Sequence, residues 1–206
     1  MKTNRTWVCL SFIVIIFSFF ATPSFGQLKA QFTSNIQSGC SPLIVAFEDQ
    51  STGNPTSWKW NLGNGTSATQ QNPITTYFNP GTYAVKLTVQ NSSGADSIIE
   101  TTYVTVYANP QAIFNAAPLL GCFPLKVNFS NSSKAGSGTI TDYLWDYGDG
   151  NFSIDAKSDH TYISSGTFDV TLKITNSYGC TNTLTKSDFV HINDGVNADF
   201  SLTSLN

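Results

Sequence analysis

The chain has 206 residues, a formal net charge of −3 and only 11% charged residues, and Arg5 is its single arginine. Because nucleic-acid-binding proteins neutralise phosphates with Arg and Lys, this composition predicts that nucleic acid is not a partner. The length fits one large domain or two small ones.

The first 26 residues predict a secretory signal peptide. Lys2 and Arg5 precede an apolar run over residues 7–21, and small residues lead to a cleavage site after Gly26. The apolar run is shorter than the roughly 20 residues that span a bilayer. We therefore expect a secreted or cell-surface protein with no transmembrane segment once the signal is removed. The remaining chain keeps 8 of the 10 Lys and Arg against all 13 Asp and Glu, so its net charge becomes −5.

Residues 27–108 predict a first domain built from short strands. Along residues 81–91, Val85 and Leu87 alternate with Lys86 and Thr88, which is the period-2 pattern of a strand with one buried face. Trp58 and Trp60 are also two residues apart and are expected to share that buried face, as are their counterparts Tyr143 and Trp145.

The sequence then repeats itself, and residues 109–194 predict a second domain. Cys122 follows Cys40 by 82 residues within matching Gly-Cys-x-Pro-Leu segments, and Trp145 follows Trp60 by 85 residues. Such self-similarity is typical of arrays of structural repeats.

Two further features complete the repeat pattern: an insertion that changes the separation between matched residues, and the start of a third copy. The second copy carries a loop insertion around residues 135–140, and a third copy begins with Ala198-Asp199-Phe200, which matches residues 30–32 and 112–114. We therefore interpret residues 195–206 as the start of a truncated third repeat.

Each copy of about 80 residues predicts an all-β, immunoglobulin-like sandwich of about seven strands. No stretch after the signal has a helical period, and turn signals recur between the strands. The joint at residues 108–111 is short and contains no Gly/Ser-rich tract, so we expect a semi-rigid row of domains.

The two copies share one sharp turn, which reads WNLGNG at residues 60–65 and WDYGDG at residues 145–150. Asn and Asp both accept the side-chain-to-backbone hydrogen bonds of an Asx-turn, and Gly supplies the backbone freedom of a reversal. The predicted structural turn and core residues are Trp60, Gly63, Gly65, Trp145, Asp146, Gly148, Asp149 and Gly150.

Calcium is a minor alternative for the acidic turn of the second copy. Asp146, Asp149 and Asp155 carry hard oxygen atoms, but their spacing is not that of an EF-hand. The first copy replaces the first two with Asn61 and Asn64. We therefore predict that this turn is a structural corner of the sandwich and that the chain binds no metal and no cofactor.

Enzyme activity is not expected, because the chain lacks the spacings of metalloprotease, serine-hydrolase and phosphate-binding motifs. Glycan binding is an alternative that requires exposed aromatic rings. The candidates Tyr107, Phe152 and Tyr178 do not repeat between the copies.

The second copy, about residues 111–193, resembles the PKD (polycystic kidney disease) domain in its Gly-Cys-x-Pro-Leu, WDYGDG, His-Thr-Tyr, Gly-Thr-Phe-Asp-Val-x-Leu and Asn-x-x-Gly-Cys segments. The first copy, about residues 29–107, aligns with the same pattern but has other residues at several of its signature positions. The resemblance implies an extracellular β-sandwich used for adhesion, spacing or protein contacts. Similar arrays occur in surface proteins of gliding bacteria of the Bacteroidetes type.

The resemblance also implies a disulfide between Cys122 and Cys180, which a secreted protein permits. Such a bridge stabilises by at most about 4 kcal/mol in the loop-entropy model. The first copy has Ala95 at the position of Cys180, which leaves Cys40 as a free thiol or, alternatively, as an intermolecular link. A first domain less stable than the second would follow.

The sequence thus predicts a non-enzymatic repeat module that serves as a spacer, adhesion or protein-interaction segment of a larger surface protein. The alternative is a glycan-binding accessory module attached to a secreted hydrolase domain outside this chain. The expected partner is an extracellular protein or glycan of unknown identity.

Overall fold

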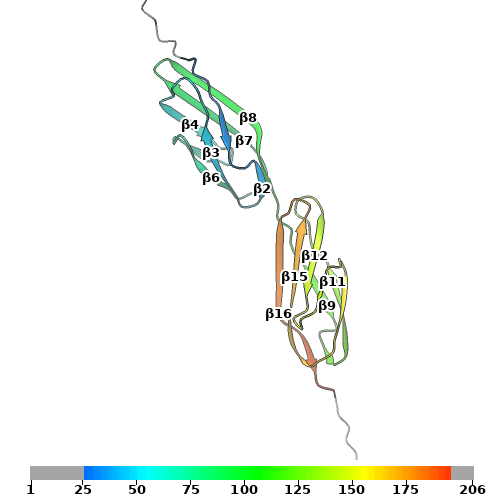
Figure 1. Ribbon diagram of the computed structural model, residues 1–206. Coiled ribbons are helices and arrows are strands. Elements are labelled where there is room, and N and C mark those ends of the chain that lie inside the picture. Colours follow the sequence, from blue (N-terminus) through cyan, green and yellow to red (C-terminus); the bar gives the residue numbers. More distant parts are fainter. Residues whose placement is uncertain (1–25, 196–206) are drawn as a thin grey trace, which may run out of the picture.

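The computed structural model describes residues 26–195, and over that range it contains strands but no helix. No described helix is therefore available to cross a membrane. Apart from Gly26 and Gly195, the predicted signal peptide (1–26) and the predicted third repeat (195–206) lie outside the described residues. Two β-sandwiches lie end to end (Figure 1), as the repeat and the period-2 patterns predict.

The first sandwich packs a three-stranded sheet, in the order β1-β3-β6, on a five-stranded sheet, in the order β2-β8-β7-β4-β5. Its strands are β1 (Phe32–Ser34), β2 (Ser38–Cys40), β3 (Leu43–Asp49), β4 (Ser57–Asn61), β5 (Ser67–Ala68), β6 (Ile74–Tyr77), β7 (Gly81–Asn91) and β8 (Gly94–Tyr107).

The second sandwich repeats this topology strand for strand, with a three-stranded sheet β9-β11-β14 and a five-stranded sheet β10-β16-β15-β12-β13. Its strands are β9 (Phe114–Ala117), β10 (Leu120–Cys122), β11 (Leu125–Asn131), β12 (Ile140–Asp146), β13 (Phe152–Ser153), β14 (Ser158–Tyr162), β15 (Gly166–Asn176) and β16 (Thr181–Asn193).

Each sandwich has eight described strands where the sequence predicts about seven. Strands of two or three residues, such as β5 and β13, are too short to show a period in the sequence. All pairings between named strands are antiparallel except β2 with β8 and β10 with β16, which are parallel. These two pairings lie at corresponding ends of the two sandwiches and place β2 beside the junction (Figure 1).

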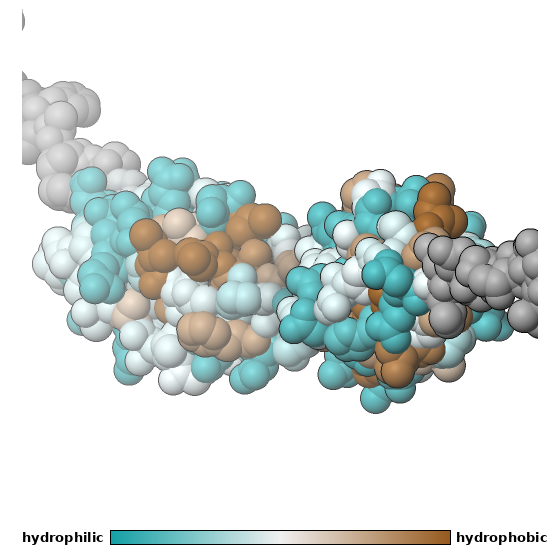
Figure 2. Space-filling model, turned by 90° about the horizontal axis from the view of Figure 1, so that it is seen from below, coloured by the Kyte–Doolittle hydropathy of each residue, from teal (hydrophilic) through white to brown (hydrophobic). Residues whose placement is uncertain are grey.

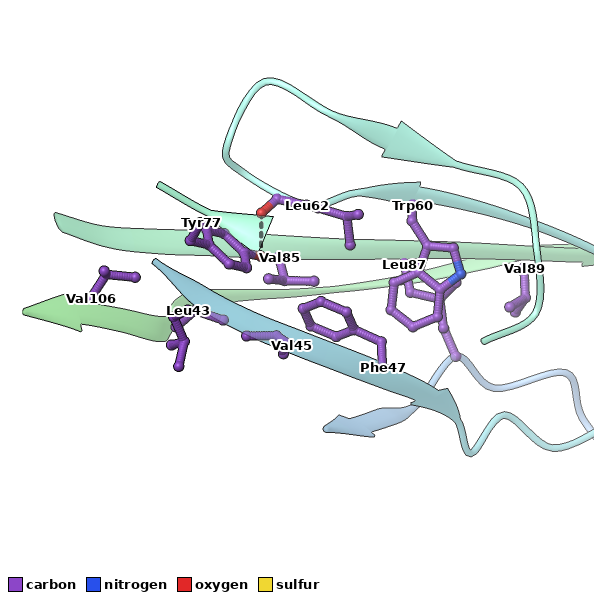
Figure 3. Packing of buried hydrophobic residues seen from close by; sticks show 12 residues of the cluster. Leu43, Val45, Phe47, Trp60, Leu62, Tyr77, Val85, Leu87, Val89 and Val106 are labelled. Carbon is purple, nitrogen blue, oxygen red and sulfur yellow. Dashed lines mark hydrogen bonds between the residues drawn. The ribbon is translucent and has the colours of Figure 1, made fainter. Parts of the chain in front are cut away.

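The core of each sandwich forms around one tryptophan between the two sheets. Trp60 and Trp145 are fully buried, whereas Trp58 and Tyr143 are half-buried and pack against the edge of the core. Figure 3 shows Trp60 over Phe47 and Leu87, which come from opposite sheets. Burying such side chains removes apolar surface from water, and this burial is the main source of stability.

Candidate functional site: the junction of the two sandwiches

The junction between the sandwiches contains a disulfide that sequence reasoning did not predict. Cys40 of β2 is bonded to Cys180, which lies in the turn before β16, with 5.5 Å between their Cα atoms. Cys122 is exposed and has no disulfide partner among residues 26–195. The predicted pairing of Cys122 with Cys180 and the prediction of Cys40 as a free thiol are therefore wrong.

The length of β16 gives the physical reason. Cys180 immediately precedes β16, whereas Cys122 pairs with Asn193 at the other end of the same strand. The 13 residues of β16 span about 40 Å, and a disulfide needs Cα atoms within about 7 Å. Cys122 and Cys180 therefore lie at opposite ends of the second sandwich. Since neither sandwich contains a disulfide of its own within residues 26–195, there is no longer a reason to expect the first domain to be less stable than the second.

The buried side chain of Asn176 binds the linker between the sandwiches. Its Nδ2 group donates to the carbonyl oxygen of Ala108 at 3.2 Å and to that of Ala135 at 3.1 Å. Its Oδ1 atom accepts from the backbone N–H groups of Tyr178 and Cys180. One amide thus fixes both the linker and the turn that carries the bridging cysteine.

The loop insertion of the second sandwich wraps around the same linker. The backbone N–H of Ser137 donates to the carbonyl oxygen of Ala108 at 3.2 Å, and the N–H of Ala108 donates to Ser137 Oγ at 2.9 Å. A Cβ atom added to Gly136 would lie 2.3 Å from the carbonyl oxygen of Asn109. The insertion around residues 135–140 therefore serves to hold the linker, and Gly136 permits the close approach.

An aromatic stack and a hydrogen bond from the linker complete the junction. The rings of Tyr107 and Tyr178 stack with centroids 3.8 Å apart and an interplanar angle of 12°. Asn109 Nδ2 donates to the carbonyl oxygen of Ser41 at 2.6 Å. Since Tyr107 and Tyr178 stack on each other, they do not form a row of free rings for a sugar, and Phe152 is the remaining exposed candidate.

The predicted corners have the same construction in both sandwiches. The indole N–H groups of Trp60 and Trp145 each donate to a backbone carbonyl at 3.0 Å, on Gln70 and Asp155 respectively. In Figure 3, the hydroxyl of Tyr77 donates to the carbonyl oxygen of Leu62, as that of Tyr162 does to Tyr147 in the second sandwich.

The first side chain after each tryptophan closes an Asx-turn. Asn61 Oδ1 accepts from the N–H of Gly63 at 3.0 Å, and Asp146 Oδ1 accepts from the N–H of Gly148 at 2.9 Å. The bond is the same whether the acceptor is an amide or a carboxylate, so charge is not required for this turn.

The second polar position of the corner differs between the copies. Asn64 Nδ2 donates to Thr75 Oγ1 at 3.1 Å, whereas Asp149 Oδ2 lies 2.6 Å from His160 Nε2, with both side chains largely buried. Burial opposes ionisation of Asp149, but hydrogen bonds from His160 and Asn151 outweigh it and hold its pKa below the usual value of 3.8. An amide–hydroxyl pair thus occupies the place of a carboxylate–imidazole pair.

The carboxylates considered for calcium do not converge. Asp146 and Asp149 accept the hydrogen bonds of the turn, and Asp155 Oδ2 lies 3.2 Å from Ser153 Oγ. Among residues 26–195, no group of three or more His, Cys, Asp or Glu side chains is placed to hold a metal ion.

Curated proteins that resemble this chain include two bacterial proteases. "Pre-pro-metalloprotease PrtV" of Vibrio cholerae is 32% identical over 149 residues, which is 71% of this chain and 16% of that protein. "Collagenase ColA" of Bacillus cereus is 49% identical over 55 residues, which is 27% of this chain and 6% of that protein. The chain thus spans only a small part of these relatives.

A solved structure is similar to part of the chain, and a family model identifies the family. The crystal structure of the PKD1 domain of the Vibrio cholerae metalloprotease PrtV is 30% identical, covers 42% of this chain and 99% of its own, and has a TM-score of 0.37. The family model described as "PKD domain" matches residues 27–106 and residues 108–192. The chain therefore belongs to the PKD domain family, with two consecutive copies of the domain.

Proposed function

We propose that this chain is a non-catalytic, extracellular segment that holds other parts of a larger protein at a fixed distance. The observation that carries the proposal is the Cys40–Cys180 bridge, which links residues 140 positions apart across the domain junction. A bridge within one sandwich would stabilise that sandwich. A bridge between sandwiches restricts their relative movement instead.

The contacts around the bridge support a stiff joint. Interfaces between domains of one chain usually permit relative motion unless they are large and hydrophobic. Here the linker is held by Asn176 and Ser137, and Tyr107 stacks on Tyr178. The disulfide adds a covalent restraint on a second path beside the linker.

The disulfide also supports the extracellular assignment and the predicted secretory signal. Structural disulfides persist in secreted, periplasmic and surface proteins and are rare in reducing compartments. The bridge between Cys40 and Cys180 needs such a compartment to form. The paired domains of residues 27–108 and 109–194 are then the units of the spacer, and its partner is an extracellular protein.

Residual dipolar couplings of the backbone amides test the stiffness of the joint. In the oxidised chain, we expect the couplings of both sandwiches to fit one alignment tensor. In a Cys40→Ser/Cys180→Ser variant, we expect two tensors of different magnitude, and Cys122→Ser serves as the matched control with one tensor. Two tensors in the oxidised chain would contradict the spacer function.

The similarity to segments of a metalloprotease and a collagenase favours a second candidate, an accessory module beside a hydrolase domain. In this candidate the sandwiches bind the substrate of that domain, a glycan or a protein such as collagen. Binding of the oxidised chain to immobilised polysaccharides and to collagen tests it. Retention on one of these matrices, lost on Phe152→Ala substitution, would favour the accessory role, and no retention would favour the spacer.

A further inference from the structure

Cys122 occupies the same structural position in the second sandwich as the bridged Cys40 does in the first. Cys40 pairs with Tyr107, the last residue of β8, and Cys122 pairs with Asn193, the last residue of β16. Both pairings belong to parallel edge strands in the same register. The backbone arrangement that presents Cys40 to the next domain is therefore repeated around Cys122.

The backbone around the two cysteines is equivalent in detail. The N–H of Ser41 donates to the carbonyl oxygen of Tyr107, and the N–H of Phe123 donates to that of Asn193. A Cβ atom on the preceding glycine would lie 2.7 Å from Leu43 Cδ1 in the first sandwich, and 2.8 Å from Leu125 Cδ1 in the second. Each cysteine is thus held beside the point where the chain leaves its sandwich.

The chain beyond the second sandwich has the same spacing as the linker between the two sandwiches. Ala112-Ile113-Phe114 begins five positions after Tyr107, and Ala198-Asp199-Phe200 begins five positions after Asn193. A domain that begins at this second motif would meet the Cys122 end of the second sandwich in the way that the second sandwich meets the Cys40 end of the first.

The end of the second sandwich also exposes apolar side chains around Cys122. Leu119, Leu120 and Phe123 are exposed, whereas Gln37, Ser38 and Ser41 stand at these positions in the first sandwich. Figure 2 views the molecule from this end and shows hydrophobic patches on the nearer sandwich, separated by hydrophilic surface. Leu119, Leu120 and Phe123 thus offer exposed apolar side chains for a contact beside Cys122.

We infer that Cys122 and its apolar surroundings bind a following PKD-type domain of the same chain, through a disulfide to a cysteine in the turn that corresponds to Cys180. The pattern is a bridge from the β2-type strand of each repeat to the β15–β16-type turn of the next. The first sandwich has Ala95 at that turn, so it can receive no such bridge. The inference extends the proposed spacer function by naming the partner of the free end.

The chemistry is that of thiol–disulfide exchange with a disulfide oxidant of the secretory compartment. The Cys122 thiolate attacks the oxidant's disulfide and forms a mixed disulfide, which the turn thiolate then resolves. One disulfide forms in the protein, and the oxidant leaves as two thiols that carry the two electrons and two protons. The Cys40–Cys180 bridge needs the same oxidant.

Peptide mapping of the protein in its natural full length tests the inference. The secreted protein is alkylated with N-ethylmaleimide without reduction, digested and analysed by mass spectrometry. We expect the Cys122 peptide to be linked to a peptide from beyond residue 206, and unmodified by the maleimide. A maleimide-modified Cys122, a link to Cys122 of a second copy, or a link to a small thiol would overturn the inference.

A Cys122→Ser variant of the same protein supplies a second readout. We expect one cysteine of the following repeat to become modified by the maleimide, while the Cys40–Cys180 link stays intact. No newly modified cysteine would contradict the inference. The mapping reports linkage rather than stiffness, so its failure would leave the dipolar-coupling test of the spacer function unaffected.

Discussion

The two sandwiches have one topology but differ in their polar corner and in the partners of their cysteines. The first corner uses Asn64 and Thr75, and the second uses Asp149 and His160. The tryptophan, the Asx-turn and the positive-φ glycines are common to both. The comparison teaches that the shape of the corner is required by the fold, whereas its charge is free to vary.

The cysteines teach a different lesson. Cys40 and Cys122 are equivalent within their sandwiches, yet within the described residues only Cys40 has a partner, because a second sandwich adjoins its end. The state of Cys40 thus depends on the domain that adjoins its sandwich. Pairing cysteines within one domain therefore gives the wrong answer for this chain.

The largest loss of stability is expected from removing the central tryptophan of either sandwich, and comparing the two losses tests whether the two cores are equivalent. Trp60→Ala and Trp145→Ala each remove a fully buried indole and its hydrogen bond to a backbone carbonyl. We expect each to lower the free energy of unfolding of its own sandwich by about 3–5 kcal/mol. Urea unfolding measures it, with the exposed Phe152→Ala as the control. A large loss in one sandwich and none in the other would break the equivalence.

The glycines of the corner separate steric contact from backbone conformation. A Cβ atom on Gly63 or Gly148 would lie 2.2 or 2.3 Å from a backbone oxygen of the facing strand, whereas Gly65 and Gly150 face open space. All four have positive φ. We expect Ala to cost about 1–2 kcal/mol at Gly65 and Gly150, and clearly more at Gly63 and Gly148. Equal losses in thermal unfolding would refute the steric contribution.

The polar pair of the second corner tests whether the two corners are interchangeable. Asp149→Asn removes the charged acceptor of His160, and we expect a loss of about 1–3 kcal/mol. The double variant Asp149→Asn/His160→Thr recreates the pair of the first sandwich, Asn64 with Thr75, and should recover part of that loss. A double-mutant cycle in urea measures the coupling. Additive losses would show that the two pairs are not equivalent.

The smallest expected effect is on stability in acid, because one partly buried carboxylate in each sandwich has a lowered pKa. Burial opposes ionisation of both, but hydrogen bonds from Ser51, Gln71 and Trp58 lower the pKa of Asp49, and those from His160 and Asn151 lower that of Asp149. The pKa of Asp159 is also lowered, by Lys126, but Asp159 is fully exposed, so we expect little stability from it. A carboxylate with a lowered folded pKa stabilises above its unfolded pKa of about 4, and this stability is lost as the pH falls further.

We therefore expect both sandwiches to become less stable as the pH decreases below about 4. Asp49→Asn should remove the acid-dependent step from the first sandwich only, and Asp149→Asn from the second only. Unfolding followed at single residues by NMR between pH 2 and 6 measures this. A step that persists in both sandwiches of both variants would assign the pH dependence to other groups.

The sandwiches and their cores could be predicted from the sequence because burial in a strand has a period of two residues. The alternation around Val85 and Leu87, and the matched Trp60 and Trp145, correspond directly to buried positions. The family could be recognised from its turn and strand segments, and the matched segments now show it. Residue order and spacing were sufficient for these features.

The junction could not be predicted because it depends on which end of the sandwich each residue occupies. The sequence separation of Cys122 and Cys180 gave no sign that β16 holds them apart. Counting the residues between the turn and the strand end would have supplied that signal. The insertion around residues 135–140 was visible, but its contact with the linker arises only when both sandwiches are in place.

The central claim is the covalent junction, and a disulfide map of this chain tests it most directly. The chain is produced in an oxidising compartment, alkylated without reduction and digested. We predict one linked pair of peptides that contains Cys40 and Cys180, together with an alkylated Cys122 when residues 1–206 are produced alone. A linked pair that contains Cys122 and Cys180, with Cys40 alkylated, would contradict the account.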